Sequence, residues 1–278
     1  MFDKSLLKPN AIDLLRDEFL VEIRNNIVIG EIKSNNAHSD AHAEFKENFD
    51  FYVQNNKGFK LTNIDQFVYK EVIIGCHHYI DGLIIKYGKE NLQILEHDYS
   101  YYNRLNPGRK WSVPGNLEPN KPLIIATPFP GYLGIHPQFE DILTEAEEKN
   151  IDVHIDGAWL SCSNGIDLDV SHSCIASIGI SLSKGYAAGW NRIGLRYTKQ
   201  KDPADPITIY DRVNMCPRSV VTNGTLILEN VPMDYMWDTY GKKYHKIVEH
   251  FDLDIGNILF AAYSKDRIIY SLTDLLKV

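Results

Sequence analysis

The strongest constraint on the fold is a series of short apolar runs, rich in β-branched residues, that begins near residue 70. Each run is bounded by Gly, Pro or Asp, and they lie at Glu71–Gly75, Leu92–Leu95, Pro122–Thr127, Ile151–Ile155, Ile175–Ile180 and Ile193–Tyr197. Continuous apolar runs of this length are typical of strands that are buried on both faces. The sequence therefore predicts six buried strands.

Helical patterns lie between several of these runs. The clearest covers residues 137–148, which begin with a proline and repeat apolar residues at helical spacing: Phe139, Ile142, Leu143 and Ala146. Residues 79–87 and 11–25 are further candidates. Strands that alternate with helices form a mostly parallel sheet covered on both faces, so we predict an α/β fold with a three-layer αβα domain. In such sheets, ligands bind beyond the carboxyl ends of the strands.

The character of the chain changes after Tyr197. Residues 200–222 are rich in Asp, Pro and Asn, which favours a linking stretch. A helical pattern follows at 233–251, and strand-like runs follow at 257–263 and 267–272. We therefore expect three parts: an N-terminal segment at 1–60, a large domain at 61–200, and a linker with a small α+β C-terminal subdomain at 201–278.

Composition limits the kinds of partner. The cysteines have no CxxC spacing and no apolar leader precedes them, so we expect reduced thiols in a cytoplasmic protein. No apolar run approaches the ~18 residues that a membrane span requires. The formal charge of −8 disfavours a nucleic-acid surface, which needs a basic footprint. We therefore expect neither a membrane nor a nucleic acid as partner, which leaves small molecules and other proteins.

Several predicted strands end in residues that can bind or react. The run 151–155 leads into Asp156, which shares a strand face with His154 because side chains alternate along a strand. The run 71–75 ends in glycine and leads into a helical segment, whose first N–H groups can bind an anion. The run 175–180 leads into a group that continues to the start of the next strand: Ser181, Ser183, Lys184 and Arg192.

An anion cradle, a carboxylate, a lysine and a second cation at one sheet edge match the needs of pyridoxal 5′-phosphate. The aldehyde of this cofactor needs an amine, and its pyridine nitrogen needs a carboxylate to stay protonated, so that the ring can accept electron density. Its phosphate needs hydroxyls, a helix N-terminus and an arginine. We therefore predict this cofactor.

The stretch SLSKGYAAGWNRIG at 181–194 resembles the lysine signature of fold-type-I pyridoxal-phosphate enzymes, the aminotransferase superfamily. In that signature an arginine stands eight residues after the lysine, as Arg192 stands after Lys184. The family's Asp-x-Ala-aromatic motif lies about thirty residues before the lysine, and DGAW at 156–159 has nearly this spacing. The resemblance covers residues 70–197 and implies a pyridoxal-phosphate-transferase-like large domain.

The resemblance implies a role for each matching residue. Lys184 would form the Schiff base with the cofactor, and Asp156 would bind its pyridine nitrogen. Ala158 would pack on one face of the ring, and Tyr99 on the other, with His97 or Tyr101 as alternatives for Tyr99. The phosphate would be held by the remaining matches: Ser181, Ser183, Arg192, Gly75, Cys76 and His77.

The sequence departs from the family pattern in three places. Residues 127–132 (TPFPGY) lack the asparagine that bonds the cofactor's phenolic oxygen in the family, and Trp159 stands where a tyrosine often serves the same atom. The chain is also short for the family, which implies a reduced N-terminal segment and a reduced small domain. In transaminases the small domain supplies an arginine for the substrate carboxylate, and Arg267 is the one candidate here.

The resemblance implies a homodimeric enzyme that acts on an amino acid or amine, with an aminotransferase as the leading reading. Lys184 would then also move the Cα proton. A decarboxylase or lyase is the alternative, because IATPFPGYLG followed by VHIDGAW also resembles amino-acid decarboxylases. A catalytically inactive protein that keeps the fold for binding is a further alternative.

A metal site is a different reading of the same strand. His154 and Asp156, with the later His172, fit the two-histidine-one-carboxylate pattern of iron(II) oxygenases. Those sites belong to antiparallel barrels with alternating strands, whereas this chain shows continuous apolar strands separated by helices. We therefore expect no metal.

Overall fold

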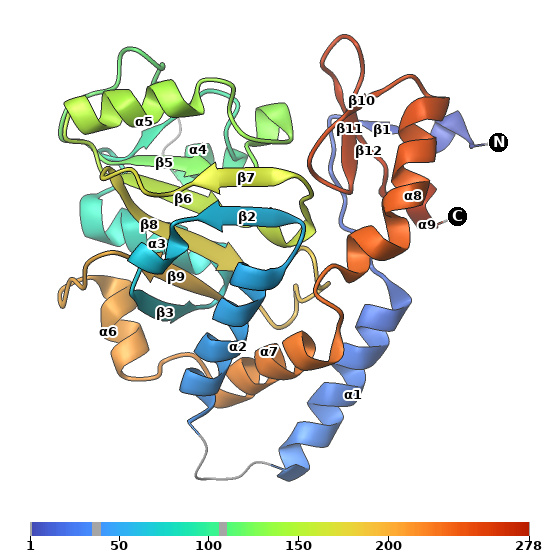
Figure 1. The fold of residues 1–278 in the computed structure, drawn as a ribbon, viewed down its shortest axis with the longest axis horizontal. Helices are drawn as coiled ribbons and strands as arrows, with labels where there is room; N and C mark the ends of the chain where they lie inside the picture. The colour runs from blue at the N-terminus through green and yellow to red at the C-terminus, as the bar shows by residue number, and fades with distance from the viewer. Residues whose placement is uncertain (1, 35–39, 106–109, 278) are drawn as a thin grey trace.

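The computed structural model describes residues 2–34, 40–105 and 110–277, and its centre is a six-stranded sheet (Figure 1). The strand order is β3-β9-β8-β6-β5-β4, with β9 antiparallel to both neighbours and the other pairs parallel. These strands match the six predicted runs: β3 (Tyr69–Ile73), β4 (Gln93–Ile94), β5 (Leu123–Ala126), β6 (Val153–Gly157), β8 (Ile175–Ser181) and β9 (Gly194–Thr198).

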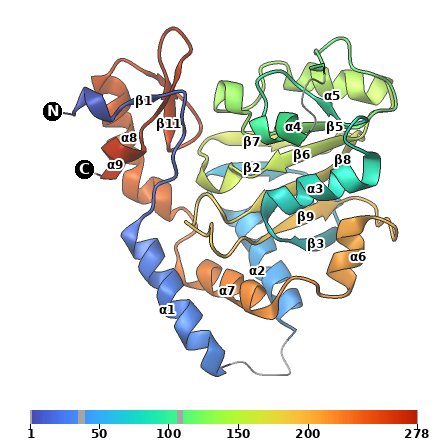
Figure 2. The ribbon, with the colours of Figure 1, turned by 180° about the vertical axis from the view of Figure 1, so that it is seen from behind.

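Helices cover both faces of the central sheet, so the predicted three-layer arrangement is confirmed. On one face, Tyr79, Ile80 and Leu83 pack against Ile73 and Ile124 of the sheet. The helices of this face are α3 (Gly75–Tyr87), α4 (Ser100–Leu105) and α6 (Pro206–Arg212). The larger core lies on the other face and includes residues of α2 (Ala41–Asn55), α5 (Phe139–Glu148) and α7 (Arg218–Asn230). Figure 2 shows α3 and α6 in front of the sheet.

A second, antiparallel sheet forms the small α+β unit beside the central sheet (Figures 1 and 2). Its order is β1-β12-β11-β10, so the first strand of the chain pairs with the last. The elements of this unit are β1 (Lys8–Pro9), α8 (Tyr235–His250), β10 (Asp254–Ile255), β11 (Ala261–Tyr263), β12 (Ile269–Ser271) and α9 (Thr273–Lys277).

The structure corrects the prediction in three regions. The predicted helix at 11–25 is instead α1 (Glu18–Ser34). The predicted linking stretch at 200–222 contains α6 and the start of α7, because Asp205 caps α6 by accepting from the N–H groups of Ile207 and Thr208, with Pro206 at the first helical position.

The third correction adds elements to parts of the chain for which no helix or strand was predicted. Helix α2 lies in the N-terminal segment, and β2 (Phe59–Thr62) pairs in parallel with β7 (Ile166–Asp169). Four short 3₁₀ helices complete the described elements: Lys4–Leu6, Ile64–Gln66, Pro130–Tyr132 and Leu160–Cys162. None of the helices within the described ranges is long and apolar enough to cross a bilayer.

Candidate active site

The carboxyl ends of β6 and β8 lie side by side and define the site. The two strands pair with Asp156 opposite Gly179 and Gly157 opposite Ile180, so Asp156 and Ser181 end at the same sheet edge. Because β9 runs in the opposite direction, it begins at this edge, opposite Ser181. The sheet topology therefore brings the segment from Ser181 to Arg192 next to Asp156.

The start of α3 forms a cradle at the same edge. Gly75 has φ of +70° at the first position of α3, which is a backbone conformation that favours glycine. A Cβ added there would lie 3.4 Å from Ser183 Oγ and 3.5 Å from Arg192 Cβ. The N-cap residue, Ile74, has no side-chain capping bond to the first turn of α3. A helix N-terminus, a hydroxyl and a guanidinium therefore converge, which is a donor set suited to a phosphate.

Asp156 is the buried acidic group of the site. Its Oδ2 accepts a hydrogen bond of 2.7 Å from the hydroxyl of Tyr102, and its Oδ1 accepts one of 3.1 Å from the N–H of Ala158. Burial raises the pKa of Asp156, while the hydrogen bonds from Tyr102, Cys76 and Ala158 oppose that rise. Tyr102 was not predicted, although it stands one helical turn after Tyr99.

Lys184 lies largely buried beside Trp159. Its Nζ is 4.8 Å from the centroid of the Trp159 ring, within the range of a cation–π contact. Burial lowers the pKa of Lys184, and the positive charge of Arg192 lowers it further. A lowered pKa favours the neutral amine, which is the form that can attack a carbonyl group.

His77 connects two of the predicted binding residues. Arg192 Nη1 lies 3.1 Å from His77 Nδ1, and the Tyr99 hydroxyl lies 3.3 Å from His77 Nε2. Since a guanidinium only donates, Nδ1 accepts, and the ring proton of neutral His77 is on Nε2. Burial and the charge of Arg192 lower the pKa of His77, which favours this neutral form.

The structure brings ten of the predicted site residues to one pocket: Gly75, Cys76, His77, Tyr99, Asp156, Ala158, Ser181, Ser183, Lys184 and Arg192. Other residues that line the pocket were not predicted, among them Leu14, Ile80, Ala126 and Pro130. Leu14 comes from the N-terminal segment, where no pattern in the sequence indicated a contact. His97 does not line the pocket, and Tyr101 packs against His77 with ring centroids 4.5 Å apart.

Arg267 is the exception among the predicted residues. It does not line the pocket, and its guanidinium lies over the rings of Tyr263 and Tyr132, at 4.5 and 5.4 Å. It precedes β12, and its side chain lies against Tyr263 of β11 and against Tyr132 of the 3₁₀ helix Pro130–Tyr132. Arg192 is the one arginine among the described residues that line the pocket.

The residues of the iron alternative lie apart. His154 Nδ1 lies 2.7 Å from Ser177 Oγ, whereas His172 pairs with Glu140 and Glu147. Across the described ranges, no three His, Cys, Asp or Glu side chains are placed to hold a metal ion. The geometry therefore gives no support to the iron(II) reading.

The fold of this chain is similar to that of known aminotransferases. No protein-family model and no curated protein match this chain in sequence. Among solved structures, the alanine aminotransferase of Pyrococcus furiosus superposes with a TM-score of 0.59 at 16% identity, over 87% of this chain and 72% of that chain. The tyrosine aminotransferase of Leishmania infantum superposes with a TM-score of 0.62 at 10% identity, over 95% of this chain and 90% of that chain.

A structure outside the aminotransferases is also similar. The pyridoxal-phosphate-bound C–S lyase of Staphylococcus hominis superposes with a TM-score of 0.59 at 12% identity, over 99% of this chain and 79% of that chain. At these identities the likeness concerns the fold. The chain therefore has the fold of the fold-type-I pyridoxal-phosphate-dependent enzymes, the aminotransferase superfamily.

Proposed function

We propose that this chain binds pyridoxal 5′-phosphate and acts on an amino acid or amine, as an aminotransferase. The observation that carries the proposal is the convergence of Lys184, Asp156 and Arg192 on one pocket. The groups in the pocket fit the cofactor. The buried carboxylate of Asp156 lies on β6, and the N-terminus of α3 lies next to Ser183 and Arg192. The amine of Lys184 lines the same pocket.

Each residue has a role in this proposal. Lys184 would hold the cofactor through its amine, and Asp156 would keep the pyridine nitrogen protonated. The phosphate would be bound by Arg192, Ser181, Ser183 and the start of α3. Tyr99 and Ala158 would cover the two faces of the cofactor ring. When bound, the cofactor supplies an acceptor for electrons from the substrate Cα. The neutral amine of Lys184 would then carry the Cα proton.

The resemblance of the sequence to the family suggests the assembly and the surroundings. We propose a homodimer that works in the cytoplasm on a small-molecule amino acid, without a nucleic acid, membrane or metal. An exposed tryptophan near the pocket supports a partner surface: Trp190 is 78% exposed and lies between Gly189 and Arg192.

A decarboxylase or lyase is the second candidate, and the position of Arg267 favours the decarboxylase, which removes the substrate carboxylate. An aminotransferase needs a cation for the substrate carboxylate, but Arg267 packs on tyrosines outside the pocket. With Arg192 assigned to the phosphate, this pocket offers no second arginine among the described residues. A protein that only binds the cofactor would keep Lys184 without turnover.

The cofactor proposal is tested by adding pyridoxal phosphate to the purified chain. We expect a visible absorption band that borohydride removes, and a phosphopyridoxyl group on the peptide that contains Lys184, detected by mass spectrometry. Lys184→Ala should lose the label, whereas Lys60→Ala, at a lysine exposed in β2, should keep it. A wild-type chain that acquires neither band nor label would refute the proposal.

The reaction is tested with a panel of amino acids. An aminotransferase converts the bound cofactor to its amine form and releases a keto acid, whereas a decarboxylase releases carbon dioxide and leaves the aldehyde form. Both products can be measured on the same sample. If the unreduced protein with bound cofactor gives neither product with any of the common amino acids, the result supports the binding-only alternative.

A further inference from the structure

A row of three polar side chains crosses the central sheet at the edge opposite the candidate active site. His154 of β6 pairs with Ser177 of β8, and Ser177 pairs with Thr198 of β9. Residues paired in this way point to the same face of a sheet. All three are buried, on a face where α3 packs mostly aliphatic and aromatic residues against the sheet.

Two of the three side chains have a polar atom without a partner. Ser177 Oγ lies 2.7 Å from both His154 Nδ1 and the Tyr79 hydroxyl, so the middle of the row is satisfied. His154 Nε2 and Thr198 Oγ1 are buried and have no hydrogen-bond partner among the described residues. Buried polar atoms without partners are rare in folded proteins and call for an explanation. Burial lowers the pKa of His154 to about 3, so its ring is neutral.

The row lines a cavity of about 460 Å³, bounded by the end of α3 and residues 199–205. This volume lies in the range of about 300–1,000 Å³ that small-molecule sites occupy. It far exceeds the ~30 Å³ share of one water molecule. Leu83, Ile175 and Pro203 provide apolar walls, and the Tyr87 ring lies 5.3 Å from the His154 ring.

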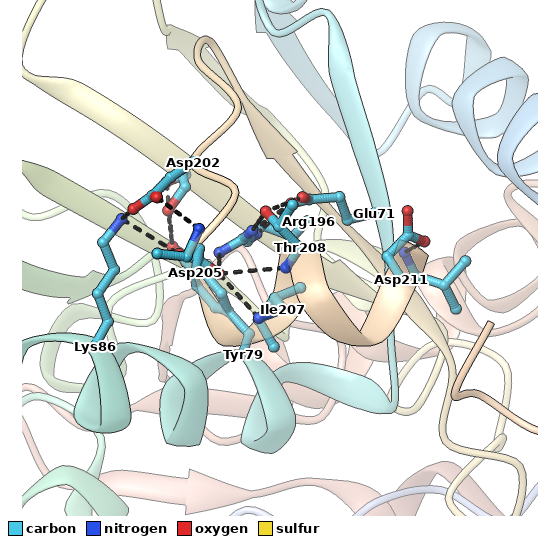
Figure 3. A network of polar contacts seen from close by, with 12 residues as sticks. Glu71, Tyr79, Lys86, Arg196, Asp202, Asp205, Ile207, Thr208 and Asp211 are labelled. Carbon is cyan, nitrogen blue, oxygen red and sulfur yellow. Dashed lines mark hydrogen bonds and ion pairs between the residues drawn. The ribbon is translucent and has the colours of Figure 1, made fainter. Parts of the chain in front are cut away.

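Two of the cations that line the cavity, Lys86 and Arg196, form ion pairs with carboxylates, and Figure 3 shows this network at one wall. Arg196 donates to Glu71 over 2.6 Å and to Asp205 over 2.7 Å. Lys86 pairs with Asp202 at 3.0 Å and with Asp205 at 3.3 Å. Four cationic side chains and three carboxylates line the cavity. Glu71, which pairs with Arg196, supplies a fourth carboxylate. The formal charges of the wall therefore balance, which favours an uncharged ligand.

We propose that this cavity is a second binding site, for an uncharged nucleobase or nucleoside. His154 and Thr198 lie on strands on either side of β8, so a flat ring would need donor and acceptor groups on opposite edges to bond both His154 Nε2 and Thr198 Oγ1. Both atoms are covered in this structure, so the side chains over them must move for the ring to bind. The Tyr87 ring contacts the imidazole, and its hydroxyl lies 3.5 Å from Asp152, so we expect binding at Nε2 to require a rotation of this side chain. Sugar hydroxyls would face Asp152 and Gln200 at the rim.

The site is independent of the proposed enzyme function. It lies on the same face of β6 as Asp156 but at the amino-terminal end of the strand, and none of its lining residues lines the active-site pocket. Between the two lie Tyr79 and Gly179, which are in close contact. A ligand in the cavity would therefore contact no residue of the proposed cofactor site.

Calorimetric titration of the full chain with adenosine, inosine, uridine and cytidine tests the proposal. We expect at least one to bind with Kd below about 1 mM. His154→Phe and Thr198→Val each remove one of the two unpartnered atoms, so binding should weaken at least tenfold while the melting temperature is retained or rises. Ala176→Leu, at a half-buried wall position, should block binding without disturbing the row.

Lys184→Ala is the matched control, since it changes only the other site, and it should bind the nucleoside as tightly as wild type. Three results overturn the proposal: no saturable binding of any of the four nucleosides, equal binding by wild type and Ala176→Leu, or loss of binding in Lys184→Ala. L-phenylalanine, of similar size but zwitterionic, should not compete. Competition by it would assign the cavity to a charged ligand instead.

Discussion

At the residue scale, two opposing effects act on Lys184. Burial lowers its pKa, because a desolvated ammonium is costly. The face of the Trp159 ring, 4.8 Å from Nζ, stabilises the charged form. Trp159 stands where related motifs often have a tyrosine that would bond the cofactor instead. Trp159 therefore acts on the pKa of the Lys184 amine, and this effect can be measured without any cofactor.

Trp159→Leu should lower the pKa of the Lys184 amine further. The cation–π contact of a partly desolvated ammonium stabilises the charged form by about 1–2 kcal/mol, so its loss should favour the neutral amine. The pH dependence of reductive methylation at Lys184, followed by mass spectrometry, measures this pKa. Trp159→Phe, which keeps an aromatic face, should give a smaller decrease. An unchanged pKa in the leucine variant would show that the ring contributes nothing.

At the element scale, the reversed direction of β9 decides which segments meet. Because β9 is antiparallel to β8, the loop that joins them returns to the edge where β8 ends. This loop carries Lys184 and Arg192 to the carboxyl end of β6.

Asp98 connects the loop before α4 to the sheet, since it accepts hydrogen bonds from the N–H groups of Tyr99 and of Ala126 in β5. It fixes Tyr99 relative to the sheet.

Asp98 makes stability depend on pH. Burial raises its pKa from 3.8 to about 8, although the two backbone N–H donors oppose the rise. The folded state therefore binds this proton more tightly than the unfolded state, and the contribution of Asp98 to stability falls as pH rises from about 4 to about 8. Urea unfolding at pH 5, 7 and 9 should show Asp98→Asn gaining stability relative to wild type as pH increases. Parallel pH profiles would contradict this assignment.

The buried ion pairs of Arg196 connect β3, β9 and α6. Arg196→Leu should lower the free energy of unfolding by about 3–5 kcal/mol, because it leaves Glu71 and Asp205 buried without their cation. Urea denaturation measures the change. Lys265→Ala, which removes an exposed pair with Asp254, is the control and should change stability within experimental error. An equally small effect for Arg196→Leu would show that water reaches the two carboxylates.

At the scale of the whole molecule, the two ends of the chain meet in the small sheet. Strand β1 pairs with β12, and the N-terminal segment also contributes Leu14 to the pocket. The small unit is thus connected to the site by the first residues of the chain as well as by the last. Trp190, 78% exposed beside the pocket, is the largest apolar side chain left in solvent at this edge.

The proposed homodimer predicts a specific mass. Light scattering after gel filtration should give twice the 31.8 kDa of one chain. Large exposed aromatic side chains are enriched at interfaces, so Trp190→Ser should shift the population toward the monomer. Phe51→Ser, at another exposed aromatic residue, on α2, is the control and should leave the mass unchanged. A monomeric wild-type chain would refute the dimer.

The sequence alone determined the central sheet and the composition of the candidate site. The β-branched runs predicted six strands, because a strand buried on both faces must be apolar throughout. Asp156 and Lys184 follow two of those runs, which placed them at one edge because parallel strands end together. Arg192 precedes the last run and lies at the same edge because that strand, β9, is antiparallel. The prediction of 200–222 as a linker was wrong: its Asp-Pro pair is also a helix start signal, and the helix forms because Asp205 caps it.

Only the tertiary structure decided which distant residues touch. The Tyr102 hydroxyl reaches Asp156 and Leu14 lines the pocket because α4 and the N-terminal segment fold over the sheet edge, and no local periodicity records such contacts. Arg267 had suitable chemistry, but the path of the small sheet places its guanidinium over Tyr263 and Tyr132. Local sequence specifies strands, helices and turn residues; packing between elements far apart in the chain decides what each side chain meets.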